Sequence, residues 1–241
     1  MATVDVEHPW TSITPVVDRI TTLAIRELNM EAATIPDVTD NPYEQKDLLR
    51  QLARETIDAY GLSVTDATMA WLEEQEEYMG MRPVAWEPKK VDIDRVEARM
   101  AHDFGPLFFE EDGYATTVKN LGFLVSDELY GRQRKTTEST AWNGNGSWAR
   151  VAHPGACAFC MLMASRGFAY KTRETAGGGH AGAHYHDHCR CLVICKKRGK
   201  VELPDSTIRA QKIYAEGREQ SPTGKPEDIL SSMRKVGNLS H

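Results

Sequence analysis

The chain has 241 residues, of which 41% are hydrophobic and 27% are charged, so it can bury a core and is too apolar to be wholly disordered. Its formal net charge of −6 argues against a free-standing protein that binds duplex DNA, because such proteins need a basic surface to neutralise phosphates. The sequence shows no apolar run as long as a membrane span and no signal-peptide pattern at its start. We therefore expect a folded protein that is made and kept in a cytoplasm, or in something assembled there.

Helical periodicity, interrupted by clear breaks, dominates the first 140 residues. From Thr14 and Pro15 onward, apolar residues recur at three- and four-residue spacing, which predicts an amphipathic helix. A second helix is expected over 43–60, with Gly61 as its C-terminal stop, and a third follows and ends at Gly80. We interpret the apolar stripes of these helices as faces that pack into a core.

The next part of the chain predicts an extended connector and two more helices. Two prolines favour an extended chain over 81–91, because proline fixes its own backbone and restricts the residue before it. A fourth helix is expected over 93–104, where a Gly-Pro pair ends it, and a fifth over 114–130. The sequence leaves open whether the fifth helix continues through the polar stretch 132–140.

A glycine- and asparagine-rich turn marks a change in the character of the chain. Residues 143–146 read Asn-Gly-Asn-Gly, the strongest turn signal in the sequence, and they place a boundary near residue 140. The apolar run 192–194 predicts a buried strand. The polar segment beyond it contains helix-like pieces near 206–216 and 226–236.

All five cysteines lie within residues 157–195, and the rest of the chain has none. A secreted disulfide scaffold would spread its cysteines along the chain, so this clustering favours a metal site. Cys157 and Cys160 form a Cys-x-x-Cys turn, which places two thiolates on one side of a metal ion. A second group of soft ligands arrives from a distant segment and completes a tetrahedron; its members are His186, Cys189 and Cys191.

The assignment of ligands within the second group is left open. We expect the side chains of Cys189 and Cys191 to diverge, so that one binds the metal while the other packs inward and His186 supplies a nitrogen. Cys195 follows the apolar run and is interpreted as a core residue. The ligands suffice to close the coordination sphere, whereas a catalytic zinc keeps one position open for water. We therefore predict a structural zinc ion as the cofactor and no catalytic residue.

These patterns together predict the α+β fold class. We expect a helical region over residues 1–140, followed by a small zinc-stapled α/β module over 141–200. A polar C-terminal tail is expected over 201–241.

Four segments carry a more specific pattern: residues 148–151, residues 157–167, Tyr170 and residues 186–191. They resemble the minor capsid proteins of actinobacterial tailed phages, a family related to the minor head protein F of phage Mu. The resemblance implies a head-morphogenesis protein inside the virion head, assembled in the host cytoplasm, with several copies in each head. Its implied partners are the portal protein, the major capsid protein or both, with a contact to packaged DNA as a further expectation. The helical region is the natural docking surface, because amphipathic helices bury apolar faces against partners.

Two enzymatic alternatives accompany this interpretation. Some members of the resembled family are labelled capsid maturation proteases, and Ser165 with His153 are the residues that such chemistry would use here. The run 186–188, His-Asp-His, also resembles the site of His-metal finger nucleases, but no matching ligands follow it. We expect a protein that works by binding and not by turnover.

Overall fold

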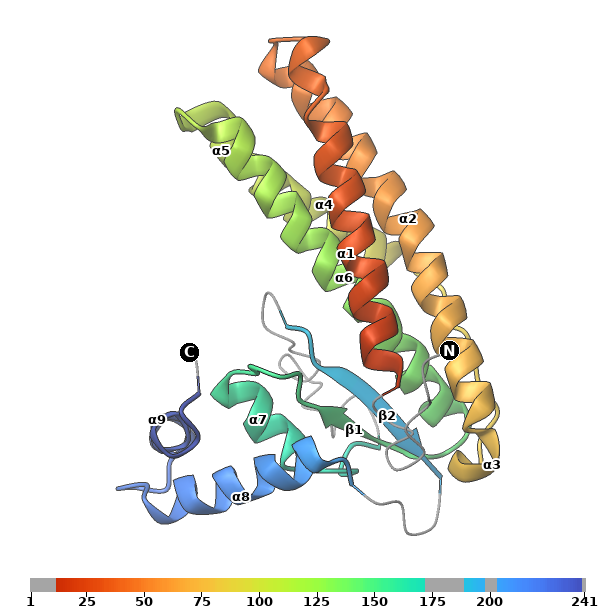
Figure 1. Cartoon of the computed structure of the whole chain (residues 1–241), viewed down its shortest axis with the longest axis vertical. Coiled ribbons are helices and arrows are strands. Elements are labelled where there is room, and N and C mark those ends of the chain that lie inside the picture. The colour runs from red at the N-terminus through yellow and green to blue at the C-terminus, as the bar shows by residue number, and fades with distance from the viewer. Residues whose placement is uncertain (1–11, 172–188, 198–202, 240–241) are drawn as a thin grey trace.

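The computed structural model describes residues 12–171, 189–197 and 203–239. Figure 1 shows an elongated molecule, with a bundle of long helices above a two-stranded sheet and several shorter helices. None of the described helices is long and apolar enough to cross a membrane. In chain order the elements are α1 (Ile13–Ala32), η1 (Ile35–Asp37), α2 (Pro42–Glu74), α3 (Glu76–Met79), α4 (Lys90–Asp103), α5 (Gly105–Phe109), α6 (Gly113–Asn143), β1 (Ser147–Val151), α7 (Ala158–Ala164), β2 (Leu192–Lys196), α8 (Asp205–Glu219) and α9 (Pro226–Gly237).

Three long helices build the bundle, and their apolar stripes form its core. α1, α2 and α6 lie side by side along the long axis of the molecule (Figure 1). Val17 and Leu28 of α1, Leu49 of α2 and Leu121 of α6 are fully buried in the same core. Burying a side chain of this size stabilises the fold by about 1.5–3 kcal/mol. The periodic apolar pattern predicted these faces only in part, because Val16 and Leu23, which belong to the apolar pattern of the first helix, are exposed.

The predicted break at Gly61 is wrong, because α2 runs without interruption from Pro42 to Glu74. Gly61 is buried inside this helix, and a Cβ atom at this position would lie 2.9 Å from Nε of Arg132 on α6. Glycine serves here to let the α6 side chain approach the backbone of α2. The need for close helix packing outweighs the weak helix propensity of glycine, which costs about 1 kcal/mol relative to alanine.

The helix α6 continues through the polar stretch that the sequence left undecided and ends at Asn143. Its polar side chains are buried because other segments of the chain bind to them. The Lys135 ammonium lies 2.9 Å from the Asp92 carboxylate on α4, and the Thr140 hydroxyl accepts a 2.9 Å hydrogen bond from the Val84 N–H. These contacts hold α4 and the extended connector that precedes it against α6.

A small antiparallel sheet lies across the lower end of the bundle (Figure 1). The turn at 143–146 ends α6 and leads into β1, whose Arg150 pairs with Val193 of β2. The buried strand predicted from residues 192–194 is therefore present, and Val193 and Ile194 are fully buried. With helices predominating over one two-stranded sheet in the described residues, the α+β prediction is confirmed.

The helices expected near 206–216 and 226–236 in the polar tail are present as α8 and α9, and each has one apolar face. Ala210 and Ile213 of α8 and Met233 of α9 are buried in a second core that also contains Cys160 and Cys189. This face was not predicted, because so few apolar positions in a polar segment give only a weak periodic signal. The division of the chain at residues 140 and 200 stays a prediction about which parts fold independently.

The contact between α8 and α9 generates a prediction about Gly217. A Cβ atom at Gly217 would lie 2.6 Å from Cγ and 3.0 Å from the backbone nitrogen of Met233. We expect Gly217→Ala to lower the free energy of unfolding by about 1–3 kcal/mol, because the backbone of α9 must move away. Gly105→Ala is the matched control, since nothing lies within 4 Å of its Cβ position. Equal unfolding midpoints for the two variants in urea would contradict this packing.

Candidate metal centre

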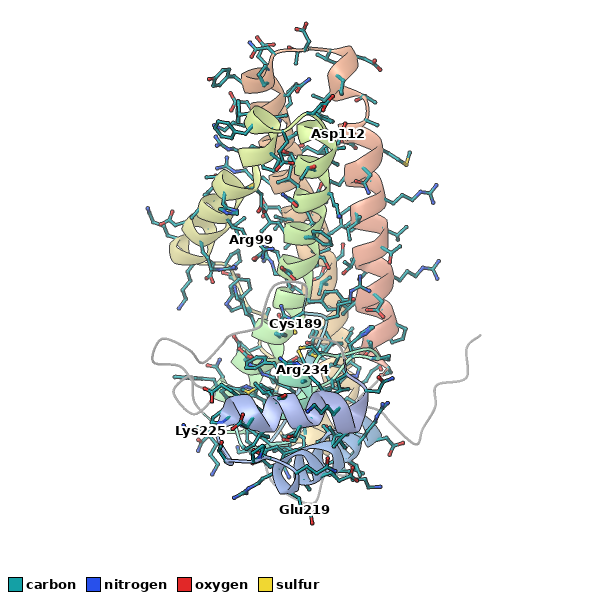
Figure 2. All side chains as sticks on the ribbon, turned by 90° about the vertical axis from the view of Figure 1, so that its left-hand side faces the viewer. Arg99, Asp112, Cys189, Glu219, Lys225 and Arg234 are labelled. Carbon is teal, nitrogen blue, oxygen red and sulfur yellow. The ribbon has the colours of Figure 1, made fainter. Side chains whose placement is uncertain are left out.

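Three cysteine sulfurs meet in the interior, between the lower end of the bundle and the C-terminal helices. The Sγ atoms of Cys160, Cys189 and Cys191 all lie within 4.8 Å of one another, and the sulfurs of Cys160 and Cys189 are 3.5 Å apart. All three residues are free thiols and are almost fully buried. Figure 2 shows Cys189 at the level where the long helices meet the lower layer.

Cys157 lies beside this three-sulfur group. It is the N-cap residue of α7, while Cys160 occupies the first turn of the same helix. A hydrogen bond between the two thiols is the largest cause that raises the pKa of Cys160. The tight turn before α7 is closed by a 2.9 Å hydrogen bond from the Ala156 N–H to the His153 carbonyl. Cys160 thus belongs to the three-sulfur group, and the role of Cys157 as a metal ligand stays a prediction.

The expectation that Cys189 and Cys191 diverge is wrong, because both sulfurs join the group with Cys160. Residues two positions apart lie on the same face of an extended chain, so no unusual backbone is required. A hydrogen bond from the Cys191 backbone contributes to the lowered pKa of the Cys189 thiol, and one from the His153 backbone opposes the raised pKa of the Cys191 thiol. Such backbone donors stabilise sulfur atoms that carry negative charge.

A buried arginine of α6 fixes the segment that carries Cys189 and Cys191. Nη1 of Arg134 donates to the carbonyl oxygens of Cys189, at 3.0 Å, and of Cys191, at 3.3 Å. Its Nη2 donates to the carbonyl of Asp127 within α6, at 3.2 Å. The positive charge of Arg134 also faces the cluster. The pKa of Cys189 is lowered chiefly by hydrogen bonds from the Cys160 and Cys191 thiols, and Arg134 lowers it further.

The neighbouring residue, Gln133, clamps the strand that follows these cysteines. Its Nε2 donates to the Val193 carbonyl at 2.8 Å, and its Oε1 accepts from the Val193 N–H at 3.1 Å. The side-chain amide thus satisfies both backbone groups of a residue in β2 that is fully buried. Sequence reasoning missed Gln133 and Arg134. The available sign was that Gln133 continues the four-residue spacing of the buried Val125 and Leu129.

Cys195 belongs to a different part of the interior. It is fully buried in the bundle core, where its sulfur lies 3.5 Å from Sδ of Met79. Burial raises the pKa of its thiol to about 12. A protonated thiol among apolar neighbours behaves as a small hydrophobic group, as the sequence predicted.

His153 connects the cysteine turn to the bundle and has no hydroxyl nucleophile as a partner in the described structure. Its Nε2 faces Oδ2 of Asp18 at 3.3 Å, and its Nδ1 faces the Pro154 carbonyl at 2.8 Å. The Tyr130 hydroxyl donates to the other oxygen of Asp18. Ser165, the nucleophile of the protease alternative, donates to the Leu162 carbonyl at 2.7 Å. The two side chains of that alternative therefore bind different groups.

His186 and the rest of the run 186–188 lie outside the described residues. The expected histidine ligand and the nuclease alternative therefore stay predictions. Three buried sulfur atoms gathered this closely fit a metal ion that prefers soft ligands.

The fold and the site define a mostly helical α+β protein with a buried thiol cluster that could hold a metal ion. The chain belongs to the family of VG15 proteins, whose family model matches residues 6–217. This is a family of phage proteins. Comparison with curated proteins and with solved structures finds no significant match.

The clamp on β2 can be tested by Gln133→Leu, which keeps the size of the side chain but removes its hydrogen-bonding groups. We expect the free energy of unfolding to fall by about 2 kcal/mol or more, because two buried backbone groups lose their partner. Gln51→Leu is the matched control, since Gln51 is an exposed helical glutamine whose side chain donates to Glu55. A loss for Gln133→Leu no larger than for Gln51→Leu, measured by urea unfolding, would argue against the clamp.

Proposed function

We propose that this VG15-family chain is a minor capsid protein that acts in head morphogenesis. It attaches to the portal protein or to the inner wall of the capsid, inside the phage head, and works by binding. It also carries one structural zinc ion. The observation that supports this most is the convergence of the segments that resemble minor capsid proteins. Residues 148–151 lie in β1, which packs on α7 within residues 157–167. Cys189 and Cys191, which precede β2, lie with their sulfurs beside Cys160 of α7.

The donor chemistry supports zinc as the metal ion. Thiolates select zinc over magnesium or calcium, which prefer oxygen ligands. In a tetrahedral site with zinc–sulfur bonds of about 2.3 Å, the sulfur atoms are about 3.8 Å apart. The 3.5 Å between the sulfurs of Cys160 and Cys189 is close to this spacing, so little rearrangement is needed.

Four thiolates complete the proposed coordination sphere: Cys157, Cys160, Cys189 and Cys191. This set differs from the one expected from the sequence, because both Cys189 and Cys191 are ligands and His186 is not. His186 would be the fourth ligand only if Cys157 did not bind the metal ion. A sphere closed by four protein ligands leaves no position for an activated water molecule. The proposed role of the metal is therefore to fix the fold around it.

The zinc proposal predicts about one zinc ion per purified chain, bound by sulfur. Cys160→Ser removes a ligand and should abolish zinc binding and destabilise the α7–α9 part of the fold, because binding energy at a structural site is folding energy. Cys195→Ser should keep its zinc, since this thiol lies outside the cluster. Elemental analysis and X-ray absorption at the zinc edge measure both outcomes. A zinc-free protein that stays folded in the presence of a chelator would refute the proposal.

The head-morphogenesis proposal predicts that the chain is a stoichiometric component of purified heads and virions. Heads assembled without it should contain a normally cleaved major capsid protein, because the chain is proposed to bind and not to cut. Ser165→Ala and His153→Ala should leave that cleavage unchanged. Quantitative mass spectrometry of purified heads measures the copy number, and gel analysis measures the cleavage. If a folded, zinc-loaded variant blocked cleavage, the protease alternative would replace this proposal.

A further inference from the structure

The end of the bundle opposite the thiol cluster carries large apolar side chains in contact with solvent. We call this end the bundle tip, formed by residues 30–47 and 105–112. The α1–α2 connection and α5 lie together at the upper end in Figure 1, and Asp112 lies there in Figure 2. Four of its apolar side chains are largely exposed: Met30 at 62%, Val38 at 74%, Tyr43 at 69% and Phe109 at 89%.

Contacts across the bundle tip hold it as one ordered surface. The rings of Tyr43 and Phe108 are 5.2 Å apart, which joins the start of α2 to α5. The Tyr114 hydroxyl donates to the Ala32 carbonyl and joins the start of α6 to the end of α1. Asn41 caps α2 by accepting a 3.0 Å hydrogen bond from the Tyr43 N–H. The rings of Phe108 and Phe109 are 6.5 Å apart, so the exposed Tyr43 and Phe109 adjoin through Phe108. A contiguous apolar surface of this kind, held by a folded framework, marks an interaction site.

The bundle tip is also strongly acidic. It contains eight acidic residues and one lysine, a net charge of −7, whereas the whole chain carries −6. The rest of the molecule is thus close to neutral, and the acidity is concentrated at this end. Five exposed carboxylates of the tip form no ion pair within the part of the chain that the structure describes: Asp37, Asp40, Glu110, Glu111 and Asp112.

This combination of charge and exposed apolar surface selects one kind of partner. A second copy of the chain would bring two acidic tips together, and nucleic acid or an anionic lipid surface would be repelled in the same way. Apolar centres rimmed by charge match a protein whose surface carries the opposite charge. We propose that the bundle tip docks into an apolar pocket of another protein that is rimmed by lysine and arginine. The inference rests on the proposed function only for naming that partner as a head protein.

Photo-crosslinking within assembling heads tests the docking site directly. Phe109 is replaced by the photoreactive residue benzoylphenylalanine in the full-length chain, and Leu62 is replaced in the same way as control. Leu62 is also apolar and 62% exposed, but it lies midway along α2, away from the tip. We expect a crosslink from position 109 to one protein, at a segment containing lysine or arginine, with at least about tenfold higher yield than from position 62.

Other crosslinking outcomes would each refute one of the two proposals. Crosslinks from position 109 to a second copy of the chain, to DNA or to lipid would overturn the docking proposal, and so would equal yields from both positions. A crosslink to a basic pocket of a protein that is not part of the head would refute the proposed function and leave the docking site standing. The two proposals therefore fail separately.

Substitutions at the bundle tip give an independent measurement. We expect Phe109→Ser and Val38→Ser each to lower incorporation of the chain into heads by about tenfold, as loss of a central interface residue does. Leu62→Ser should leave incorporation unchanged. Because Phe109 and Val38 are exposed, these variants should keep the unfolding midpoint and zinc content of the unmodified chain. Unchanged incorporation of both tip variants would overturn the proposal.

Discussion

The fold depends on one set of contacts, in which buried polar side chains of α6 bind the backbone of the cysteine segment and of β2. Gln133 binds both backbone groups of Val193, and Arg134 binds the carbonyls of Cys189 and Cys191. Inside a protein, each of these groups is costly when it lacks a partner. The second half of α6 therefore cannot be buried favourably unless β2 and the cysteine segment pack against it. The cost of burying unpaired polar groups, and not apolar contact alone, selects this long-range packing.

The same contacts connect the thiol cluster to the rest of the molecule. Arg134 links the cysteine segment to α6, and His153 links the turn before α7 to Asp18 on α1. On the other side, α7 packs on α8 and α9 through the core that contains Cys160 and Cys189. A metal ion at the cluster would thus join two segments that are about thirty residues apart in sequence to a framework that already holds both. Its binding energy would stabilise the lower part of the molecule as a unit.

The sequence predicted those features that depend on local patterns. Helical periodicity identified the helices of the bundle and part of their buried faces, and the Asn-Gly-Asn-Gly run identified the end of α6. It failed where distant parts of the chain decide the outcome. Gly61 looks like a helix stop because the approach of Arg132 from α6 is not visible locally. Gln133 looks like a surface residue until β2 is placed beside it.

The two ends of the molecule are joined by α6, but different contacts stabilise each of them. Its 31 residues make a helix about 46 Å long, with the bundle tip at its start and Gln133 and Arg134 in its last three turns. At the tip, Tyr114 and Phe108 pack on α1 and α2 and have no contact with the thiol cluster. Loss of a metal ion would therefore loosen the lower part and leave the tip ordered. A surface held by the bundle alone can dock whether or not the cluster is filled, so binding and metal loading are expected to be independent steps.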